Sequence, residues 1–113
     1  MEERINASVL LSFYGPLLTP KQRQSLRLHN EEDLSLADIA EMSGVSRQGV
    51  YDAIHRGEEQ LLELERRLGL QKRWVKMCDG LRQSRAALEK GDQAQAMNII
   101  NGLLAEEEGI DGL

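Results

Sequence analysis

Cysteine, proline and aromatic residues are all scarce in this 113-residue chain, and each shortage excludes a class of structure. The lone cysteine, Cys78, cannot form an internal disulfide, which fits a reducing compartment and predicts a small apolar core residue. The only prolines are Pro16 and Pro20, so proline bars nothing after Pro20 from a helix. Aromatic residues make up 4% of the chain, so aliphatic side chains must build the core. Runs of alternating β-branched residues are absent, and no strand is predicted.

Patterns typical of enzymes, metal sites and membrane proteins are also missing. There is no paired acid–base group, metal-ligand cluster or phosphate loop, and Cys78 lies far in sequence from both histidines. The sequence therefore predicts a non-enzymatic protein without a cofactor or a metal. The apolar run at residues 9–14 is too short to span a bilayer, and residues 1–4 are acidic where a signal peptide is basic. We expect a cytoplasmic protein that does not insert into membranes.

Helix-forming residues and helical apolar spacing predict an all-α protein. Capping residues and glycines mark the helix ends: Thr19 with Gln22, then Ser35, Ser46 and the Gly91–Asp92 pair. The helices are expected at residues 3–14, 20–30, 36–42, 47–68, from just past Gly69 to 90, and from 93 to about 104. An interruption of the helix at Arg56–Gly57 is the alternative to one continuous helix over 47–68, because glycine costs about 1 kcal/mol in a helix relative to alanine. The acidic tail, residues 106–112, is expected to fray.

The chain is expected to comprise two parts. Residues 1–69 are predicted to form a helix-turn-helix domain. Residues 70–113 are predicted to form a C-terminal helical extension that packs on this domain or on a partner subunit.

Residues 35–57 carry the pattern of a helix-turn-helix. The first helix needs a small residue where the second crosses it, and Ala40 supplies it. The turn needs a residue that tolerates positive φ, which Gly44 does, and the second helix needs a cap, which Ser46 provides. The interior positions are apolar: Ile39, Val45, Val50 and Ile54. A helical hairpin that serves only for packing is the alternative interpretation.

This packing predicts an outward face on the second helix. Its members are Arg47, Gln48, Tyr51, Asp52 and His55. Arginine can grip guanine and glutamine can grip adenine, each through two hydrogen bonds, and the first turn of such a helix usually reaches base edges. The helix N-terminus, beside Ser46, favours a phosphate. Three cations of the helix expected at residues 20–30, which precedes the motif, are candidate phosphate contacts: Lys21, Arg23 and Arg27.

Three segments resemble the promoter-reading C-terminal region of bacterial sigma factors: residues 18–28, 36–47 and 53–61. The opening at residues 11–19, together with residues 46–52, resembles the YlxM family of helix-turn-helix DNA-binding proteins. The resemblance covers about residues 1 to 75. It implies a stand-alone helix-turn-helix protein that acts as an accessory or regulator of the signal recognition particle pathway. Position by position, it places Ser46, Arg47, Gln48 and Tyr51 in the recognition turn, whereas Asp52 departs from the basic sigma pattern.

The second half of the chain contains two further features. Residues 66–90 hold eight basic and two acidic residues, a local charge of +6 in a chain of net charge −5. This stretch is either an electrostatic footprint for nucleic acid or a solvated helix face. Ile54, Leu61 and Leu68 recur at seven-residue steps, which predicts either a homodimer seam or a face packed on the fifth helix.

Two functions follow from these patterns. The leading hypothesis is a non-enzymatic helix-turn-helix regulator that binds DNA or RNA. The alternative is a protein-interaction adaptor of the signal recognition particle pathway. It would bind the GTPase of that pathway, called the targeting GTPase below, or its RNA. The net charge and Asp52 favour the adaptor, and the intact turn favours nucleic acid.

Overall fold

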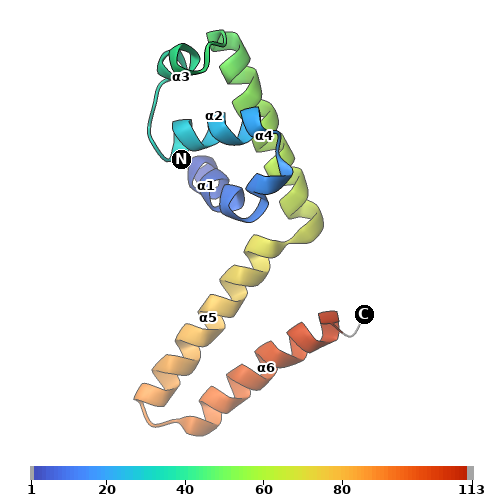
Figure 1. Cartoon of the computed structure of the whole chain (residues 1–113). Coiled ribbons are helices and arrows are strands. Elements are labelled where there is room, and N and C mark those ends of the chain that lie inside the picture. Colours follow the sequence, from blue (N-terminus) through green and yellow to red (C-terminus); the bar gives the residue numbers. More distant parts are fainter. Residues whose placement is uncertain (1, 112–113) are drawn as a thin grey trace. The chain divides into compact units, whose positions relative to one another are not determined.

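Helices make up nearly all of the computed structural model, which describes the backbone of residues 2–111 and the side chains of residues 7–109 (Figure 1). The described residues contain no strand, which confirms the all-α prediction. The helices are α1 (Glu2–Tyr14), η1 (Gly15–Leu17, a 3-10 turn), α2 (Pro20–Asn30), α3 (Leu36–Ser43), α4 (Arg47–Leu68), α5 (Leu70–Glu89) and α6 (Gln93–Asp111).

The predicted caps hold the helix ends. Thr19 and Gln22 form a reciprocal capping box at the start of α2. The Ser35 hydroxyl accepts a hydrogen bond from the Asp38 amide (3.1 Å), and the Ser46 hydroxyl accepts one from the Gly49 amide (3.0 Å). Each hydroxyl satisfies a backbone donor that the first helical turn leaves unpaired.

The chain separates into two compact units, residues 1–71 and 72–113. The boundary lies inside α5, because hydrogen bonds hold its first two residues to the first unit. The Leu70 amide donates to the Tyr14 hydroxyl (3.0 Å), and the Gln71 amide donates to the Glu65 carboxylate (3.0 Å). Tyr14 itself donates to Glu65 (2.7 Å), and burial and this carboxylate raise the pKa of the Tyr14 phenol.

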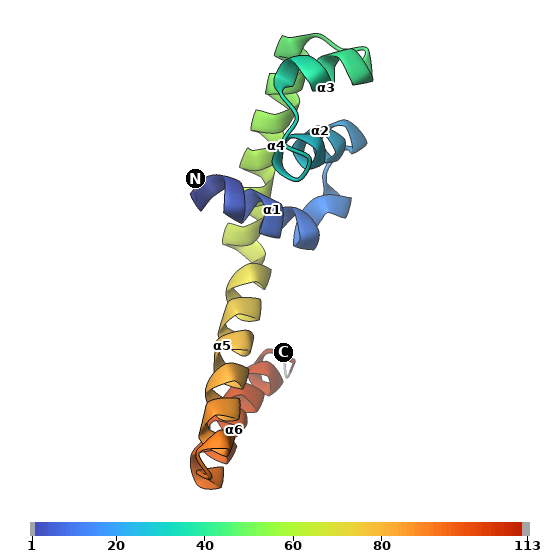
Figure 2. The same ribbon diagram turned by 90° about the vertical axis from the view of Figure 1, so that its left-hand side faces the viewer.

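The core of the first unit gathers on α4. Helices α1, α2 and α3 all pack against it, and Figure 2 shows α3, α2 and α1 following one another along α4. The largest fully buried side chains are Leu10, Tyr14, Leu26, Ile39, Val50 and Leu61. The predicted seam of Ile54, Leu61 and Leu68 is therefore wrong in both interpretations: the first two residues are buried against α1–α3, and Leu68 is exposed.

The alternative interruption at Arg56–Gly57 is absent, because α4 runs unbroken through both residues. Gly57 is buried at the crossing of α2, where a Cβ atom would lie 2.6 Å from Leu26 Cδ1 and 3.4 Å from Gln22 Cβ. The missing side chain lets the two helices approach closely, which offsets the low helix propensity of glycine.

The acidic tail is also helical where fraying was expected, since α6 continues to Asp111. Ion pairs connect this end of α6 to α5. Glu107 binds Arg73 (2.6 Å) and Glu106 binds Lys76 (2.5 Å). These pairs lie within the second unit and stabilise the last turns of α6 against fraying.

Replacing Gly44 by valine should destabilise the first unit by about 1–3 kcal/mol, the range for strained backbone sites. Gly44 has φ +68°, and apart from itself and its two chain neighbours no residue has an atom within 4 Å of the position its Cβ would take. The loss therefore comes from the left-handed backbone, which β-branched residues resist and asparagine tolerates. Thermal unfolding followed by circular dichroism measures it, with Gly44→Asn as the control. Equal stability of Gly44→Val and the parent would contradict the role of Gly44 in the turn.

Candidate nucleic-acid interface

The turn between α3 and α4 has the geometry that the sequence predicted. Gly44 ends α3 in the left-handed conformation, and its amide donates to the Ala40 carbonyl. The Val45 amide bonds the same carbonyl (3.2 Å), which tightens the turn. Ala40 is buried in the core cluster, and Ser46 caps α4 with extended backbone. The first turn of α4 is thereby fixed relative to α3.

The side chains of α4 divide as expected between core and solvent. Val50 and Ile54 are buried, whereas Arg47, Gln48, Tyr51 and His55 are exposed. The rings of Tyr51 and His55 stack, with centroids 5.9 Å apart and planes 6° apart. We call Arg47, Gln48, Tyr51 and His55 the recognition face.

Asp52 binds a member of the recognition face. The Gln48 side-chain amide donates a hydrogen bond to the Asp52 carboxylate (3.0 Å), and both residues are exposed. A base that uses the Gln48 amide must therefore replace this bond. Base readout through Gln48 would carry the cost of breaking this contact.

The three predicted phosphate contacts on α2 are exposed but do not form one cluster. Lys21 lines an open groove of about 240 Å³ together with Asp52 and Arg56 of α4. The Arg23 side chain lies over Gly15 instead, with Cδ 3.6 Å from where a Cβ would be. Arg27 lies one turn beyond Arg23, in the last turn of α2.

Arg56 is a cation of this groove that the sequence analysis missed. It lies on α4 four residues after Asp52, and this spacing brings both residues to one helix face. The spacing is the signal that could have identified it. Arg56 and Lys21 add positive charge beside the start of the recognition face.

Residues 1–99 match the protein-family model described as "UPF0122: Putative helix-turn-helix protein, YlxM / p13 like". The chain belongs to the UPF0122 family. A UPF0122 protein of Symbiobacterium thermophilum is 39% identical over 109 residues, which are 94% of this chain and 99% of the relative. A UPF0122 protein of Clostridium kluyveri is 54% identical over 70 residues, which are 62% of this chain and 63% of the relative. The family match confirms the predicted YlxM resemblance.

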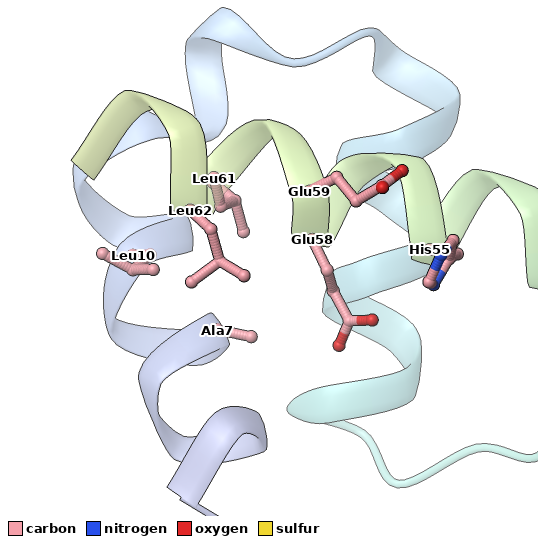
Figure 3. A pocket seen from close by; sticks show the side chains of 7 residues that line it. All are labelled: Ala7, Leu10, His55, Glu58, Glu59, Leu61 and Leu62. Atoms are coloured by element: carbon pink, nitrogen blue, oxygen red, sulfur yellow. The ribbon is translucent and has the colours of Figure 1, made fainter. Parts of the chain in front are cut away.

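A second groove bounds the recognition face of this UPF0122 protein. It lies between α1 and α4 and has a volume of about 230 Å³ (Figure 3). Apolar side chains and two carboxylates line it beside His55: Ala7, Leu10, Leu61, Leu62, Glu58 and Glu59. Because these carboxylates repel phosphate, a nucleic acid would contact α4 only as far as about His55 and Arg56.

The basic stretch of the UPF0122 chain is largely paired with acidic side chains. Arg66 and Arg67 both bind Glu63 (2.6 and 2.7 Å), and hydrogen bonds from these arginines lower the pKa of Glu63 to about 2. Three further pairs are Arg73–Glu107, Lys76–Glu106 and Arg82–Asp79. At least five of the eight cations thus have carboxylate partners, which favours a solvated face over a nucleic-acid footprint.

The described part of this UPF0122 chain contains neither a membrane-spanning helix nor a group of side chains arranged to bind a metal. None of its helices has the length and apolar character needed to cross a membrane. No group of three or more His, Cys, Asp or Glu side chains within it is arranged to hold a metal ion. Cys78 is a free, half-buried thiol in the second unit.

Proposed function

We propose that this UPF0122 protein is a non-enzymatic regulator that binds nucleic acid through the first half of α4. The observation that carries the proposal is the recognition face. It lies directly after a capped turn, on the solvent side of a helix whose Val50 and Ile54 are fixed in the core. A helix presented in this way can enter the major groove of DNA with its first turn against base edges.

Each member of the face has a chemical role in this proposal. Arg47 grips a guanine, and Gln48 exchanges its bond to Asp52 for an adenine. The stacked rings of Tyr51 and His55 contact the adjoining bases or sugars. Lys21 and Arg56 bind phosphates that flank the major groove of the DNA. Ser46 lies at the N-terminus of α4, which favours a further phosphate.

The resemblance to YlxM proteins supports a cytoplasmic role as an accessory or regulator of the signal recognition particle pathway. The adaptor is the second candidate function. It would bind the targeting GTPase or its RNA without reading a DNA sequence. The net charge of −5 and the Gln48–Asp52 bond favour it, because both weaken binding to phosphate.

Salt dependence tests this proposal. Removing both cations, as Lys21→Gln with Arg56→Gln, should make the negative slope of log K against log salt shallower by about 2. Each phosphate contact contributes about 0.9 on duplex DNA, or about 0.7 on single strands. Fluorescence anisotropy with labelled DNA and with targeting RNA, at several salt concentrations, measures the slope. Binding of the targeting GTPase is measured in parallel.

Arg66→Gln is the matched control, because Arg66 is an exposed cation of the same helix beyond the acidic groove. It should leave the slope unchanged. A double variant with the parent's slope would contradict the phosphate contacts. Binding of the GTPase alone, with no binding of either nucleic acid, would overturn the nucleic-acid proposal in favour of the adaptor.

A further inference from the structure

The groove between α1 and α4, called the α1–α4 groove below, has an apolar floor (Figure 3). Ala7, Leu10 and Leu61 line it and are themselves buried. Leu62 also lines it but is 57% exposed, and Figure 3 shows its side chain directed toward Ala7 across the groove. Because a cavity of about 150 Å³ holds a benzene ring, a groove of about 230 Å³ has room for at least one apolar side chain.

Two carboxylates of α4 line the same groove without a partner among the described residues. Glu58 is half-buried and Glu59 is exposed, and neither takes part in an ion pair or a side-chain hydrogen bond within that part of the chain. Glu63, the next carboxylate of α4, is instead bound by Arg66 and Arg67. A half-buried carboxylate has lost part of its hydration, so a cation that reaches Glu58 is attracted more strongly than at an open surface.

The α4 side of the groove is one helix face. Its residues follow the helical spacing i, i+3, i+4 and i+7: His55, Glu58, Glu59 and Leu62. Figure 3 shows Leu62 beside α1, Glu58 next along the helix and His55 at the far end. Seven residues of α-helix rise about 10 Å, so an apolar site and an acidic rim follow each other over about two turns.

This combination of apolar and acidic groups selects among ligands. The carboxylates repel phosphate, which excludes nucleic acid and the surface of an anionic membrane. A purely cationic ligand would leave Leu62 in water, and a purely apolar one would cover Glu58 without pairing its charge. A ligand that satisfies both sides carries apolar and cationic groups one helical turn apart, as an amphipathic helix with leucine and lysine or arginine does.

We propose that the α1–α4 groove binds a basic amphipathic helix of a partner protein. An apolar side chain of the partner helix enters between Ala7 and Leu62. Lysine or arginine side chains one turn away pair with Glu58 and Glu59. The contact covers about two turns of α4, which is small for a protein interface, so the complex is weak and reversible.

This docking site goes beyond the proposed function and does not rest on it. His55 lines the groove and also belongs to the recognition face, so the variants below leave it unchanged. Replacing Glu58 and Glu59 by glutamine should preserve binding of nucleic acid, because carboxylates make no favourable contact with phosphate. Loss of peptide binding and loss of nucleic-acid binding are therefore separate results.

Binding of a synthetic helical peptide to the full chain tests the proposal. The probe is a fluorescent peptide of about 18 residues, long enough to form a helix, with leucine on one face and lysine on the other. Fluorescence anisotropy should show that the parent binds this peptide and does not bind the same peptide with glutamate in place of lysine. Glu58→Gln with Glu59→Gln should raise the dissociation constant about 10-fold, because two charge-assisted contacts are lost. Leu62→Ala should also raise it about 10-fold, through lost apolar burial.

Matched controls remove the same groups from positions outside the groove. Asp38→Asn with Glu41→Gln removes two exposed carboxylates of α3, and Leu68→Ala shortens another exposed leucine of α4. Both should leave the dissociation constant within about twofold of the parent, because charges beyond a Debye length are screened and Leu68 does not line the groove. Circular dichroism confirms that each variant stays helical.

A charge reversal provides a second test. Glu58→Lys with Glu59→Lys should exchange the preference, so that the glutamate peptide binds more tightly than the lysine peptide. An unchanged preference would overturn the proposal, and so would equal effects of the groove and control variants or no binding of the lysine peptide to the parent at about 100 μM. Sedimentation equilibrium identifies the other occupant: a parent mass above 12.7 kDa that Leu62→Ala lowers would show that a second copy fills the groove instead.

Discussion

Replacing Leu61 by alanine should lower the free energy of unfolding of the first unit by about 2–5 kcal/mol. Leu61 is completely buried on α4, in the cluster formed with residues of α1, α2 and α3. Truncation removes its apolar contacts and leaves a cavity that the surrounding helices cannot fully close. Urea unfolding followed by circular dichroism measures the loss.

Leu62 provides the control for this substitution, because it is the next residue on the same helix and is 57% exposed. Leu62→Ala should change the free energy of unfolding by no more than about 0.5 kcal/mol. Equal losses for the two variants would contradict the packing of α4 described above. A difference of several kcal/mol would establish the face of α4 that holds the recognition residues in place.

Replacing Arg47 and Gln48 together by alanine should abolish sequence preference if α4 reads bases. Each bidentate contact contributes about 1–3 kcal/mol of discrimination, so the double variant should lose on the order of 100-fold or more in specificity. Folding should change little, because both side chains are exposed and the Ser46 cap is kept. Selection from a random DNA library, followed by binding of the enriched sequence, measures the preference.

The same helix offers a matched control, since Gln60 and Arg66 are also an exposed glutamine and arginine of α4. Gln60→Ala with Arg66→Ala should keep the preference of the parent. Retained preference in the Arg47–Gln48 variant would end the assignment of base readout to these residues. Loss of GTPase binding in that variant, with no DNA binding by the parent, would make the recognition face a protein-docking surface.

Much of the candidate site could be predicted from the sequence because its signals are local. The Ser46 hydroxyl caps α4 by accepting a hydrogen bond from the amide of Gly49, only three residues on. Gly44 adopts the left-handed conformation because glycine has no side chain to prevent it. Val50 and Ile54 point inward because helical periodicity ties them to one face. Arg23 differs, because its position over Gly15 depends on how α1 and α2 meet.

By itself, the sequence therefore determined the all-α class, the main helix ends and the outward face of α4. The contacts between residues far apart in the sequence were decided only by the tertiary structure. Tyr14 holds Leu70 across 56 positions, and Gly57 stays helical because α2 packs against it. The acidic end of α6 is ordered because Arg73 and Lys76 lie opposite it, which also removes much of the free charge of the basic stretch. Caps and turns act over three or four residues and can be read from residue order, whereas packing and ion pairs depend on which helices meet.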